Sequence, residues 1–273
     1  MTLIMGVVNV TTDSFSDGGR YLEADAATAH GRALFADGAH ILDIGGESTR
    51  PGADRVPPDV EQARVVPVIA GLRREVPGAI LSVDTMNAST ARAAVEAGAN
   101  IVNDVSGGLS DPDMLAAVAE TAAEIVLGHW RGPSSEMYAR ADYDDVAAEV
   151  VGELRERADA ALSAGIAADR IILDPGIGFG KRGEQNWQAL RATPALVGTG
   201  FRVLIGTSRK RFFADALGPD PDIARRDLAT AVTSVLAAQA GAWAVRVHDV
   251  AATRDAIGVW NHWDGSATQG GTP

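Results

Sequence analysis

The feature that most constrains the fold of this 273-residue chain is a regular alternation of short apolar segments with longer alanine-rich segments. The short segments are rich in β-branched residues, which is typical of strands, whereas the longer ones have helical periodicity. We predict eight strands, at Ile4–Asn9, Ile41–Ile44, Ile80–Asp84, Ile101–Asp104, Glu124–Leu127, Ile171–Asp174, Arg202–Ile205 and Ala244–Val247. Helices are expected in the gaps, for instance at Asp59–Glu75, Asn87–Ala97, Asp144–Ala164 and Ile223–Ala240, and several open with an Asp or Asn suited to N-capping.

Apolar strands separated by helices indicate an α/β fold with a parallel sheet that helices cover. The count of eight strands favours closure into a single (β/α)8 barrel of the TIM type, and a doubly wound open sheet is the alternative. Nothing in the body of the chain resembles a linker, so residues 1–264 are expected to form one barrel domain. Residues 265–273 are rich in Gly, Ser, Thr and Gln and are expected to form a disordered tail.

Composition excludes several classes of function. The net charge of −12 and the pI of about 4.8 argue against nucleic acid as a partner, because phosphates require a basic face. No run of ~18 apolar residues could span a bilayer, and the apolar start lacks the basic region and cleavage site of a signal peptide. The chain has no cysteine, which excludes disulfides and thiolate metal sites and fits a reducing, cytoplasmic compartment.

Almost every predicted strand is followed at once by polar or glycine-rich sequence. Gly-Gly-Glu-Ser-Thr-Arg-Pro-Gly follows the second strand, and the sixth strand runs into Asp-Pro-Gly-Ile-Gly-Phe-Gly-Lys. In a closed barrel the carboxyl ends of all strands meet at one face, where barrel enzymes have their active sites. We therefore predict an active site at this face, and a local basic cluster there would allow it to bind a small anionic substrate.

Taken singly, these segments also have structural explanations. Asp84 and Asp174 could cap helices or stabilise loops, and the run Arg209–Arg211 could be a solvated surface patch. His248 differs, because it alternates with Arg246 along a strand and should point to the same side. The convergence of all these segments at one face is what favours a functional site over the structural explanations.

In this order, the segments resemble those of the dihydropteroate synthase family of the folate pathway. They extend from about residue 3 to 260 and comprise Gly6–Gly19, Gly45–Gly52, Ser82–Thr85, Val102–Gly108, Leu173–Lys181, Ser208–Lys210 and Arg246–His248. The resemblance implies a (β/α)8 barrel, usually a homodimer, with Mg²⁺ as cofactor. The implied reaction joins 6-hydroxymethyl-7,8-dihydropterin pyrophosphate to p-aminobenzoate and releases pyrophosphate.

Two positions depart from the family pattern. Thr12 stands where many relatives have Pro, which changes the stiffness of the first loop more than its chemistry. Gly128 stands where the family usually has a Met that lines the pterin pocket, so we expect a more open wall there.

The resemblance places the pterin against four side chains. The Asp174 carboxylate would accept the two adjacent N–H donors of the pyrimidine edge, and Asn103 would both donate and accept. Asp84 would accept from a remaining ring N–H. Lys210 would donate to the ring carbonyl and N5.

The remaining roles concern the leaving group and the second substrate. Pyrophosphate would be bound by Arg50, Arg246 and His248, and Mg²⁺ by Asn9 together with the phosphates. The p-aminobenzoate pocket would form from Phe15 and Asp17 in the first loop, Thr49 and Pro51 in the second, a stacking Phe179, and Ser208 as donor to the carboxylate. The predicted catalytic set is Asn9, Asp17, Arg50, Lys210, Arg246 and His248. It needs no covalent nucleophile, because its work is electrostatic stabilisation of the leaving group and exclusion of water.

Two other functions are compatible with parts of this pattern. A pterin-binding methyl-carrier module of the kind found in corrinoid methyltransferases would share the barrel and the pterin carboxylates without binding pyrophosphate. The segments Ser208–Lys210 and Arg246–His248 and the long first loop argue against it. A catalytically silent paralogue is the second alternative, and the intact motifs disfavour it.

Overall fold

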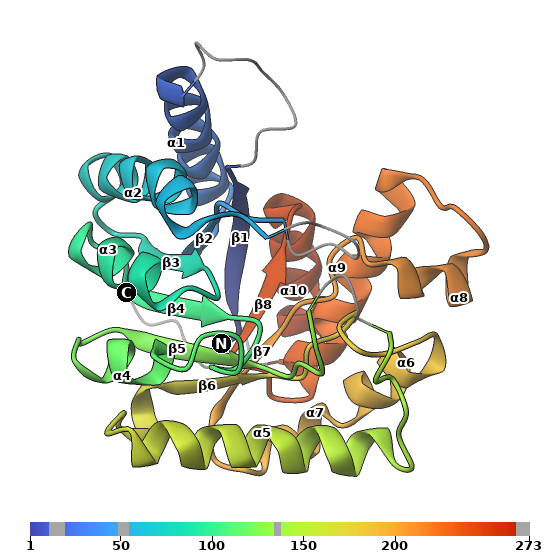
Figure 1. Ribbon diagram of the computed structural model, residues 1–273. Helices are drawn as coiled ribbons and strands as arrows, with labels where there is room; N and C mark the ends of the chain where they lie inside the picture. The colour runs from blue at the N-terminus through green and yellow to red at the C-terminus, as the bar shows by residue number, and fades with distance from the viewer. Residues whose placement is uncertain (11–19, 49–54, 134–137, 266–273) are drawn as a thin grey trace.

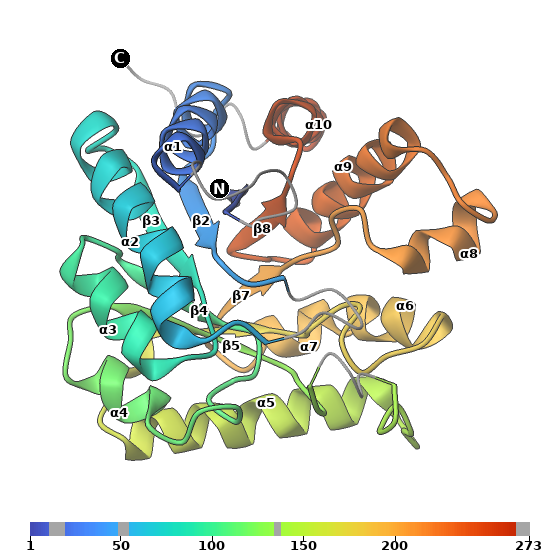
Figure 2. The same ribbon diagram turned by 45° about the horizontal axis from the view of Figure 1, so that its top comes forward.

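Eight parallel strands close into one barrel, in the order β1-β2-β3-β4-β5-β6-β7-β8, in the computed structural model, which describes residues 1–10, 20–48, 55–133 and 138–265. Helices lie around the outside of the barrel (Figures 1 and 2). β1 pairs with β8 in parallel, with Leu3 opposite Ala244, and this pairing closes the sheet. The predicted (β/α)8 barrel is confirmed, and the open doubly wound sheet is not observed. Apart from Gly265, the predicted tail lies outside the described residues.

The strands are β1 Leu3–Asn9, β2 Ile41–Gly45, β3 Ile80–Asp84, β4 Ile101–Asp104, β5 Glu124–Gly128, β6 Ile171–Asp174, β7 Arg202–Ile205 and β8 Ala244–Val247. The helices are α1 Arg20–Ala36, α2 Pro58–Glu75, α3 Ala88–Glu96, α4 Met114–Ala119, α5 Val146–Ser163, α6 Glu184–Arg191, α7 Thr193–Val197, α8 Ala214–Leu217, α9 Ile223–Gln239 and α10 Val250–Trp263. Two short 3-10 helices, η2 Ala168–Arg170 and η3 Arg211–Phe213, precede β6 and α8. None of these helices is long and apolar enough to cross a membrane.

The predicted strand ends agree with the observed ones to within one residue, and the four predicted helices to within two. The capping residues are less well predicted. Asp145, rather than Asp144, caps α5 by accepting from Ala148 N at 3.0 Å. Asn87 stands at the N-cap of α3 without capping it, because its Oδ1 accepts from Arg55 Nη2 at 3.0 Å and its Nδ2 donates to Glu61 at 2.8 Å. The α3 N-terminus is instead satisfied by the Asp111 carboxylate from the next loop.

Side-chain alternation along the strands divides the barrel interior into two layers. The lower layer is a small apolar cluster made of Met5, Ile41, Ile101, Val126, Ile172, Leu204 and Ala244. Successive side chains on a strand point to opposite faces, so the residue two positions further along also points inward. Counting on from Ile41, Ile101, Ile172 and Ala244 gives Asp43, Asn103, Asp174 and Arg246. A polar layer therefore lies directly above the apolar one, at the carboxyl ends of the strands.

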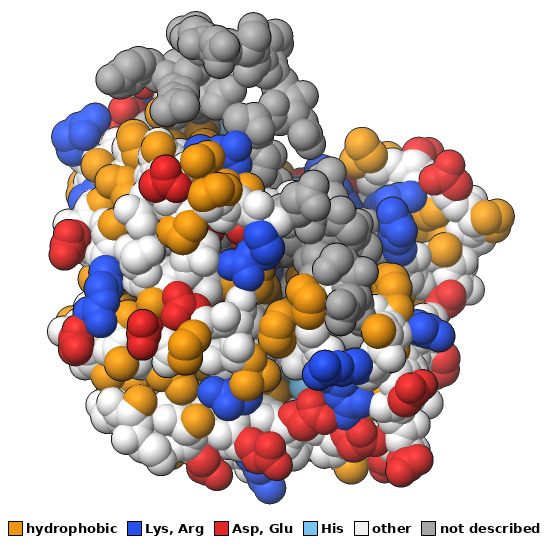
Figure 3. Space-filling view, viewed as in Figure 1, with side chains coloured by type: hydrophobic (Ala, Val, Ile, Leu, Met, Phe, Trp, Pro, Cys, Tyr) orange, Lys and Arg blue, Asp and Glu red, His pale blue; other side chains and the backbone are white. Residues whose placement is uncertain are grey.

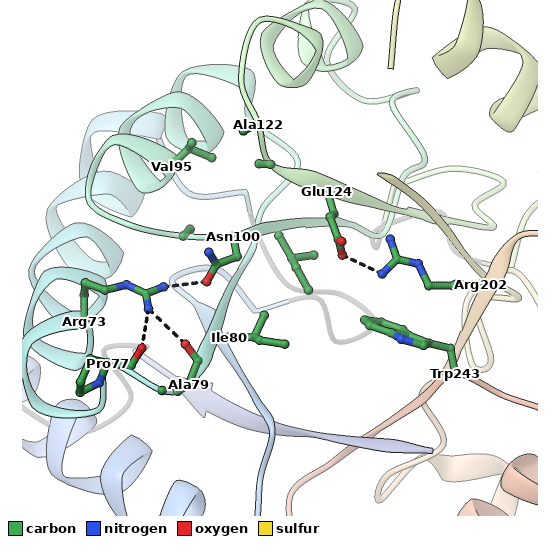
Figure 4. Close-up of a pocket in the computed structure, with 14 residues that line it drawn as sticks. Arg73, Pro77, Ala79, Ile80, Val95, Asn100, Ala122, Glu124, Arg202 and Trp243 are labelled. Carbon is green, nitrogen blue, oxygen red and sulfur yellow. Dashed lines mark hydrogen bonds and ion pairs between the residues drawn. The ribbon is translucent and has the colours of Figure 1, made fainter. Parts of the chain in front are cut away.

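The opposite end of the barrel has a cavity of about 540 Å³ (Figure 4). Its charged side chains are already paired within the protein. Arg73 donates to the Gly98 carbonyl and to Asn100 Oδ1, and Arg202 pairs with Glu124 at 3.1 Å. Such an end of a barrel contributes to stability rather than chemistry.

Gly128 ends β5, where we expected a more open wall. A Cβ built on Gly128 would lie 2.5 Å from the carbonyl oxygen of Val105 and 2.6 Å from its Cα. The expectation is wrong in this structure, because the backbone of the β4–α4 loop already occupies that space.

This contact predicts the effect of a minimal substitution. Gly128→Ala is expected to lower the free energy of unfolding by about 1–3 kcal/mol, since backbone atoms cannot move aside as a flexible side chain can. Denaturant-induced unfolding measures the change. Gly152→Ala is the matched control, because Gly152 lies in α5 with no heavy atom within 4 Å of the added Cβ. The control should gain about 0.5–1 kcal/mol through helix propensity. An equal stability for Gly128→Ala and the wild type would contradict the packing described here.

Candidate active site

A buried ion-pair cluster lies at the centre of the polar layer. Arg246 on β8 donates through Nε to Asp43 Oδ2 on β2 at 2.6 Å, and through Nη2 to Asp84 Oδ2 on β3 at 2.8 Å. Asn103 on β4 donates through Nδ2 to the same Asp43 oxygen at 3.1 Å. Side chains from four strands therefore meet, and these include the predicted site residues Asp84, Asn103 and Arg246.

Burial and ion pairing set the charges of this cluster. Asp43 is fully buried and Asp84 almost so. Burial raises the pKa of Asp84 above its ordinary value, and the positive charge of Arg246 opposes that effect. Burial alone would lower the pKa of Arg246, but the Asp43 and Asp84 carboxylates raise it above its ordinary value. Arg246 is therefore a permanent cation shared between two carboxyl groups.

A second group of charges surrounds Gly206, at the end of β7. A Cβ built on Gly206 would lie 3.7 Å from Arg246 Cβ, 3.9 Å from Asp174 Oδ2 and 3.9 Å from Lys210 Nζ. The missing side chain at Gly206 thus leaves space among an anion and two cations. Asp174, Lys210 and Arg246 were all predicted to bind substrate, and the structure brings them together.

Lys210 reaches this point across the loop that follows β6. Its Nζ donates to the Ile177 carbonyl and lies 4.8 Å from the centre of the Phe179 ring. Burial lowers the pKa of Lys210 to about 8, and the nearby Asp174 carboxylate partly offsets that effect. Burial likewise raises the pKa of Asp174, and the charge of Lys210 opposes it. Each of the two groups favours the charged form of the other.

Ser208 and His248 form a hydrogen-bonded pair beside Lys210. Ser208 Oγ lies 2.8 Å from His248 Nδ1 and accepts from His248 N at 3.1 Å. Arg209 turns away from both, with a positive φ of 58°, and its guanidinium binds Asp227 on α9 through two bonds of 2.7 and 2.8 Å. The basic run is therefore not simply a solvated patch, since it divides between the site and a helix contact.

The comparisons with known proteins agree with this geometry. The family described as pterin binding enzyme matches residues 5–248. The chain is 51% identical to the dihydropteroate synthase of Mycobacterium leprae (strain TN) over 95% of this chain and 93% of that protein. It belongs to the dihydropteroate synthase family. A solved structure of the Xanthomonas albilineans dihydropteroate synthase with 4-aminobenzoic acid has a TM-score of 0.88 at 46% identity and covers 99% of this chain and 94% of that one. Another, in complex with 7,8-dihydropteroate, has a TM-score of 0.84 at 44% identity and covers 99% and 95%.

Several residues that the family resemblance singles out lie beyond the part of the chain that the structure describes. These are Phe15, Asp17, Thr49, Arg50 and Pro51. Asn9 is described, and it lies exposed at the end of β1, opposite Gly45 of β2. In the described ranges no group of three or more His, Cys, Asp or Glu residues could hold a metal ion.

Sequence reasoning missed Asp43, the residue that links Arg246 to Asn103. The available signal was a single charged residue inside the otherwise apolar segment Ile41–Gly45, spaced by two from an inward-facing Ile41. The sequence analysis also gave Arg246 and Asp84 different roles, with Arg246 as a ligand of the leaving group and Asp84 as a ligand of the pterin. The structure joins these two side chains directly.

Loss of the Asp43 charge is expected to destabilise the protein. Asp43→Asn keeps the shape but removes one carboxylate from Arg246, so the free energy of unfolding should fall by about 1.5–3 kcal/mol, the usual range for hydrogen bonds to charged groups. Denaturant unfolding provides the measurement. The same change in the exposed pair of Arg254 and Asp255, Asp255→Asn, should have an effect within about 0.5 kcal/mol. Equal effects of the two substitutions would mean that Asp43 contributes no more than a surface carboxylate.

Proposed function

We propose that this chain catalyses the condensation of 6-hydroxymethyl-7,8-dihydropterin pyrophosphate with p-aminobenzoate, which gives 7,8-dihydropteroate and pyrophosphate in folate biosynthesis. The observation that carries the proposal is the convergence of Asp174, Lys210 and Arg246 around Gly206. It occurs in a chain similar over nearly its whole length to an enzyme solved with 4-aminobenzoic acid and with 7,8-dihydropteroate. The activity is that of a transferase.

The hydrogen bonds of the site indicate which atoms would bind the pterin. Asn103 uses one N–H of its Nδ2 for Asp43, so its side-chain carbonyl would accept from the pterin and its second N–H would donate. Asp174 uses Oδ1 for the Gly176 amide, which leaves Oδ2 facing the space at Gly206. Asp84 binds Arg246 through Oδ2, and its other oxygen would accept from the ring N–H. Lys210 would donate to the ring carbonyl and N5.

For the leaving group, we propose Arg246, His248 and Arg50 as the cationic and hydrogen-bonding ligands. Two of the three guanidinium nitrogens of Arg246 are held by Asp43 and Asp84, so its Nη1 would be the donor to phosphate. Because these carboxylates hold the guanidinium group of Arg246 rigidly, its charge need not reorganise when pyrophosphate leaves. This is the condition for electrostatic catalysis. Because Arg246 also binds Asp84, pterin recognition and leaving-group stabilisation are coupled in this site.

We further propose that Mg²⁺ binds with the pyrophosphate substrate, with Asn9 as a protein ligand. The exposed Asn9 at the end of β1 fits an ion that keeps several waters and is bound mainly through phosphate oxygens. When bound, Mg²⁺ would neutralise negative charge on the departing pyrophosphate.

The p-aminobenzoate would lie beside Phe179 and Ser208, with Phe15, Asp17, Thr49 and Pro51 of the first two loops completing its pocket. Phe179 stands next to Lys210, and Ser208 next to His248. Small molecules, rather than nucleic acid or membranes, are the proposed partners, and the cytoplasm the proposed location. Figure 3 shows acidic and basic side chains intermixed over one face.

Release of pyrophosphate that depends on added p-aminobenzoate is the decisive assay. A pterin-binding methyl carrier or a silent paralogue would bind pterin without releasing pyrophosphate. Absence of release from folded protein supplied with both substrates and Mg²⁺ would overturn the proposal.

The pterin assignment predicts that Asp174→Asn weakens binding of 6-hydroxymethylpterin by at least about 10-fold, because an amide nitrogen faces a donor where an acceptor is needed. Isothermal titration calorimetry measures this affinity. Asp169→Asn is the matched control, since Asp169 is exposed near the other end of β6. Unchanged affinity in Asp174→Asn would refute the assignment.

We also propose a homodimer, with α9 and α10 at the contact. These neighbouring helices expose large apolar side chains, among them Leu228 at 66% and Trp263 at 90% exposure. On α9, Leu228, Val232 and Leu236 recur every four residues and so form one row. A second copy would cover such a row.

Leu236→Asp is therefore expected to convert a dimer into a monomer in sedimentation velocity experiments, because a charge buried without a partner opposes association. Leu162→Asp, at the similarly exposed Leu162 on α5, should leave the dimer intact. Monomeric wild-type protein at micromolar concentration would contradict the proposed dimer.

A further inference from the structure

Lys181 is a fully buried lysine to which the proposed reaction assigns no role. It lies in the loop between β6 and α6 and is 1% exposed. A buried lysine is rare unless its charge is paired or hydrogen-bonded. Lys181 Nζ lies 2.9 Å from His129 Nδ1 and donates to the carbonyls of Gly176 and Phe179, both at 3.1 Å. Three acceptors match the three N–H bonds of an ammonium group. They and the nearby Asp174 carboxylate favour the charged form, against burial, which lowers the pKa of Lys181 to about 7.

His129, at the end of β5, can serve as one of these acceptors because it is neutral. Burial, with the adjacent charge of Lys181, lowers its pKa to about 4. Its other ring nitrogen, Nε2, faces the Glu153 carboxylate on α5 at 3.0 Å. An imidazole ring that carries its proton on Nε2 accepts at Nδ1. His129 Nδ1 is therefore available as an acceptor for the Lys181 ammonium group.

The loop that Lys181 holds is rich in glycine, so its backbone conformation depends on specific contacts. Gly176, Gly178 and Gly180 have φ values of 63°, 83° and 59°, so alternate residues are left-handed glycines. Glycine allows this backbone path but does not favour it over others. Gly176 also packs so closely on the segment after β5 that a Cβ there would lie 2.2 Å from the His129 carbonyl oxygen. Specific hydrogen bonds must therefore select the observed conformation.

The same loop carries three elements of the proposed active site. Asp174 precedes it and accepts from the Gly176 amide at 2.8 Å. The Ile177 carbonyl accepts from Lys210, and the Phe179 ring lies beside that lysine. The two carbonyls bound by Lys181, those of Gly176 and Phe179, lie on either side of Ile177. In addition, burial raises the pKa of Asp174, and the charge of Lys181 is one of several that oppose this effect.

We propose that Lys181 is a positioning residue for pterin recognition: its ammonium group binds the loop from the side opposite the substrate and thereby fixes Asp174, the Ile177 carbonyl and Phe179. This inference rests on the proposed function. Lys181 itself touches no substrate.

The test compares three proteins for affinity toward 6-hydroxymethylpterin. Lys181→Met removes the ammonium group while keeping an unbranched side chain of similar length. It is expected to weaken binding by about 10- to 100-fold, the usual consequence of losing a hydrogen bond to a charged group. Tyr143→Phe is the control, since it also removes one hydrogen bond to this loop, from Tyr143 Oη to the Gly180 carbonyl at 2.9 Å, and no charge. It should change the affinity by less than about 3-fold, although both variants are expected to unfold at lower temperature.

Restoring the charge chemically separates positioning from general destabilisation. Because the chain has no cysteine, Lys181→Cys introduces a unique thiol. Alkylation with 2-bromoethylamine in denaturant, followed by refolding, rebuilds a side chain of lysine length that ends in an ammonium group. Affinity should return to within about 3-fold of the wild-type value, whereas alkylation with iodoethane should not restore it. If Lys181→Met does not fold, Lys181→Gln replaces it in the comparison.

The outcomes are distinguishable from failure of the proposed function. If the wild-type chain binds no pterin and releases no pyrophosphate, the proposed function fails. If the wild type does both, and folded Lys181→Met or Lys181→Gln binds pterin normally, only the role of Lys181 is overturned. The same holds if the aminoethylated protein binds pterin no better than the ethylated one.

Discussion

Closure of eight parallel strands into one barrel is the constraint on which the rest of this structure depends. Closure brings the carboxyl ends of all strands to one face, and the two-residue period of a strand sets which side chains point inward there. The inward residues of the lower layer are apolar, and those two positions further on include Asp43, Asn103, Asp174 and Arg246. The site is thus one layer of the barrel interior in which polar residues replace apolar ones.

That replacement places charges where burial is costly, and the structure compensates by pairing them. Arg246 is shared by Asp43 and Asp84, and Asp174 stands close to Lys210. Burial raises the pKa of the carboxyl groups Asp84 and Asp174 and lowers that of Lys210. Opposite charges offset much of this effect. An array of fixed, mutually compensating charges suits a reaction in which a C–O bond breaks to give a pyrophosphate anion and a carbon-centred cation. The dipoles of such an array need little rearrangement as these charges form.

Much of this could be predicted from the sequence. The strand boundaries follow from apolar runs that end at polar or glycine-rich segments, and the predicted ends differ from the observed ones by one residue at most. Asp84, Asn103, Asp174 and Arg246 were predicted as site residues from the family resemblance together with their places at strand ends. The contacts among them were not predictable. Arg246 and Asp43 are 203 residues apart in the chain. No local sequence pattern shows that Arg246 Nε donates to Asp43 Oδ2 at 2.6 Å. Lys181 belongs to the segment Leu173–Lys181, which carries part of the family resemblance. Its burial against His129, however, depends on how two loops pack.

The sequence alone determined what depends on local rules: alternation of strand and helix, the inward period of each strand, the polar character of the strand ends and the family. The tertiary structure alone decided what depends on distances between segments far apart in the chain. It paired Arg246 with both Asp43 and Asp84, turned Arg209 outward to Asp227, and filled the space beside Gly128 with the backbone of Val105. The physical reason is that propensity and periodicity act over a few neighbouring residues, whereas an ion pair or a close contact depends on the relative placement of whole strands and loops.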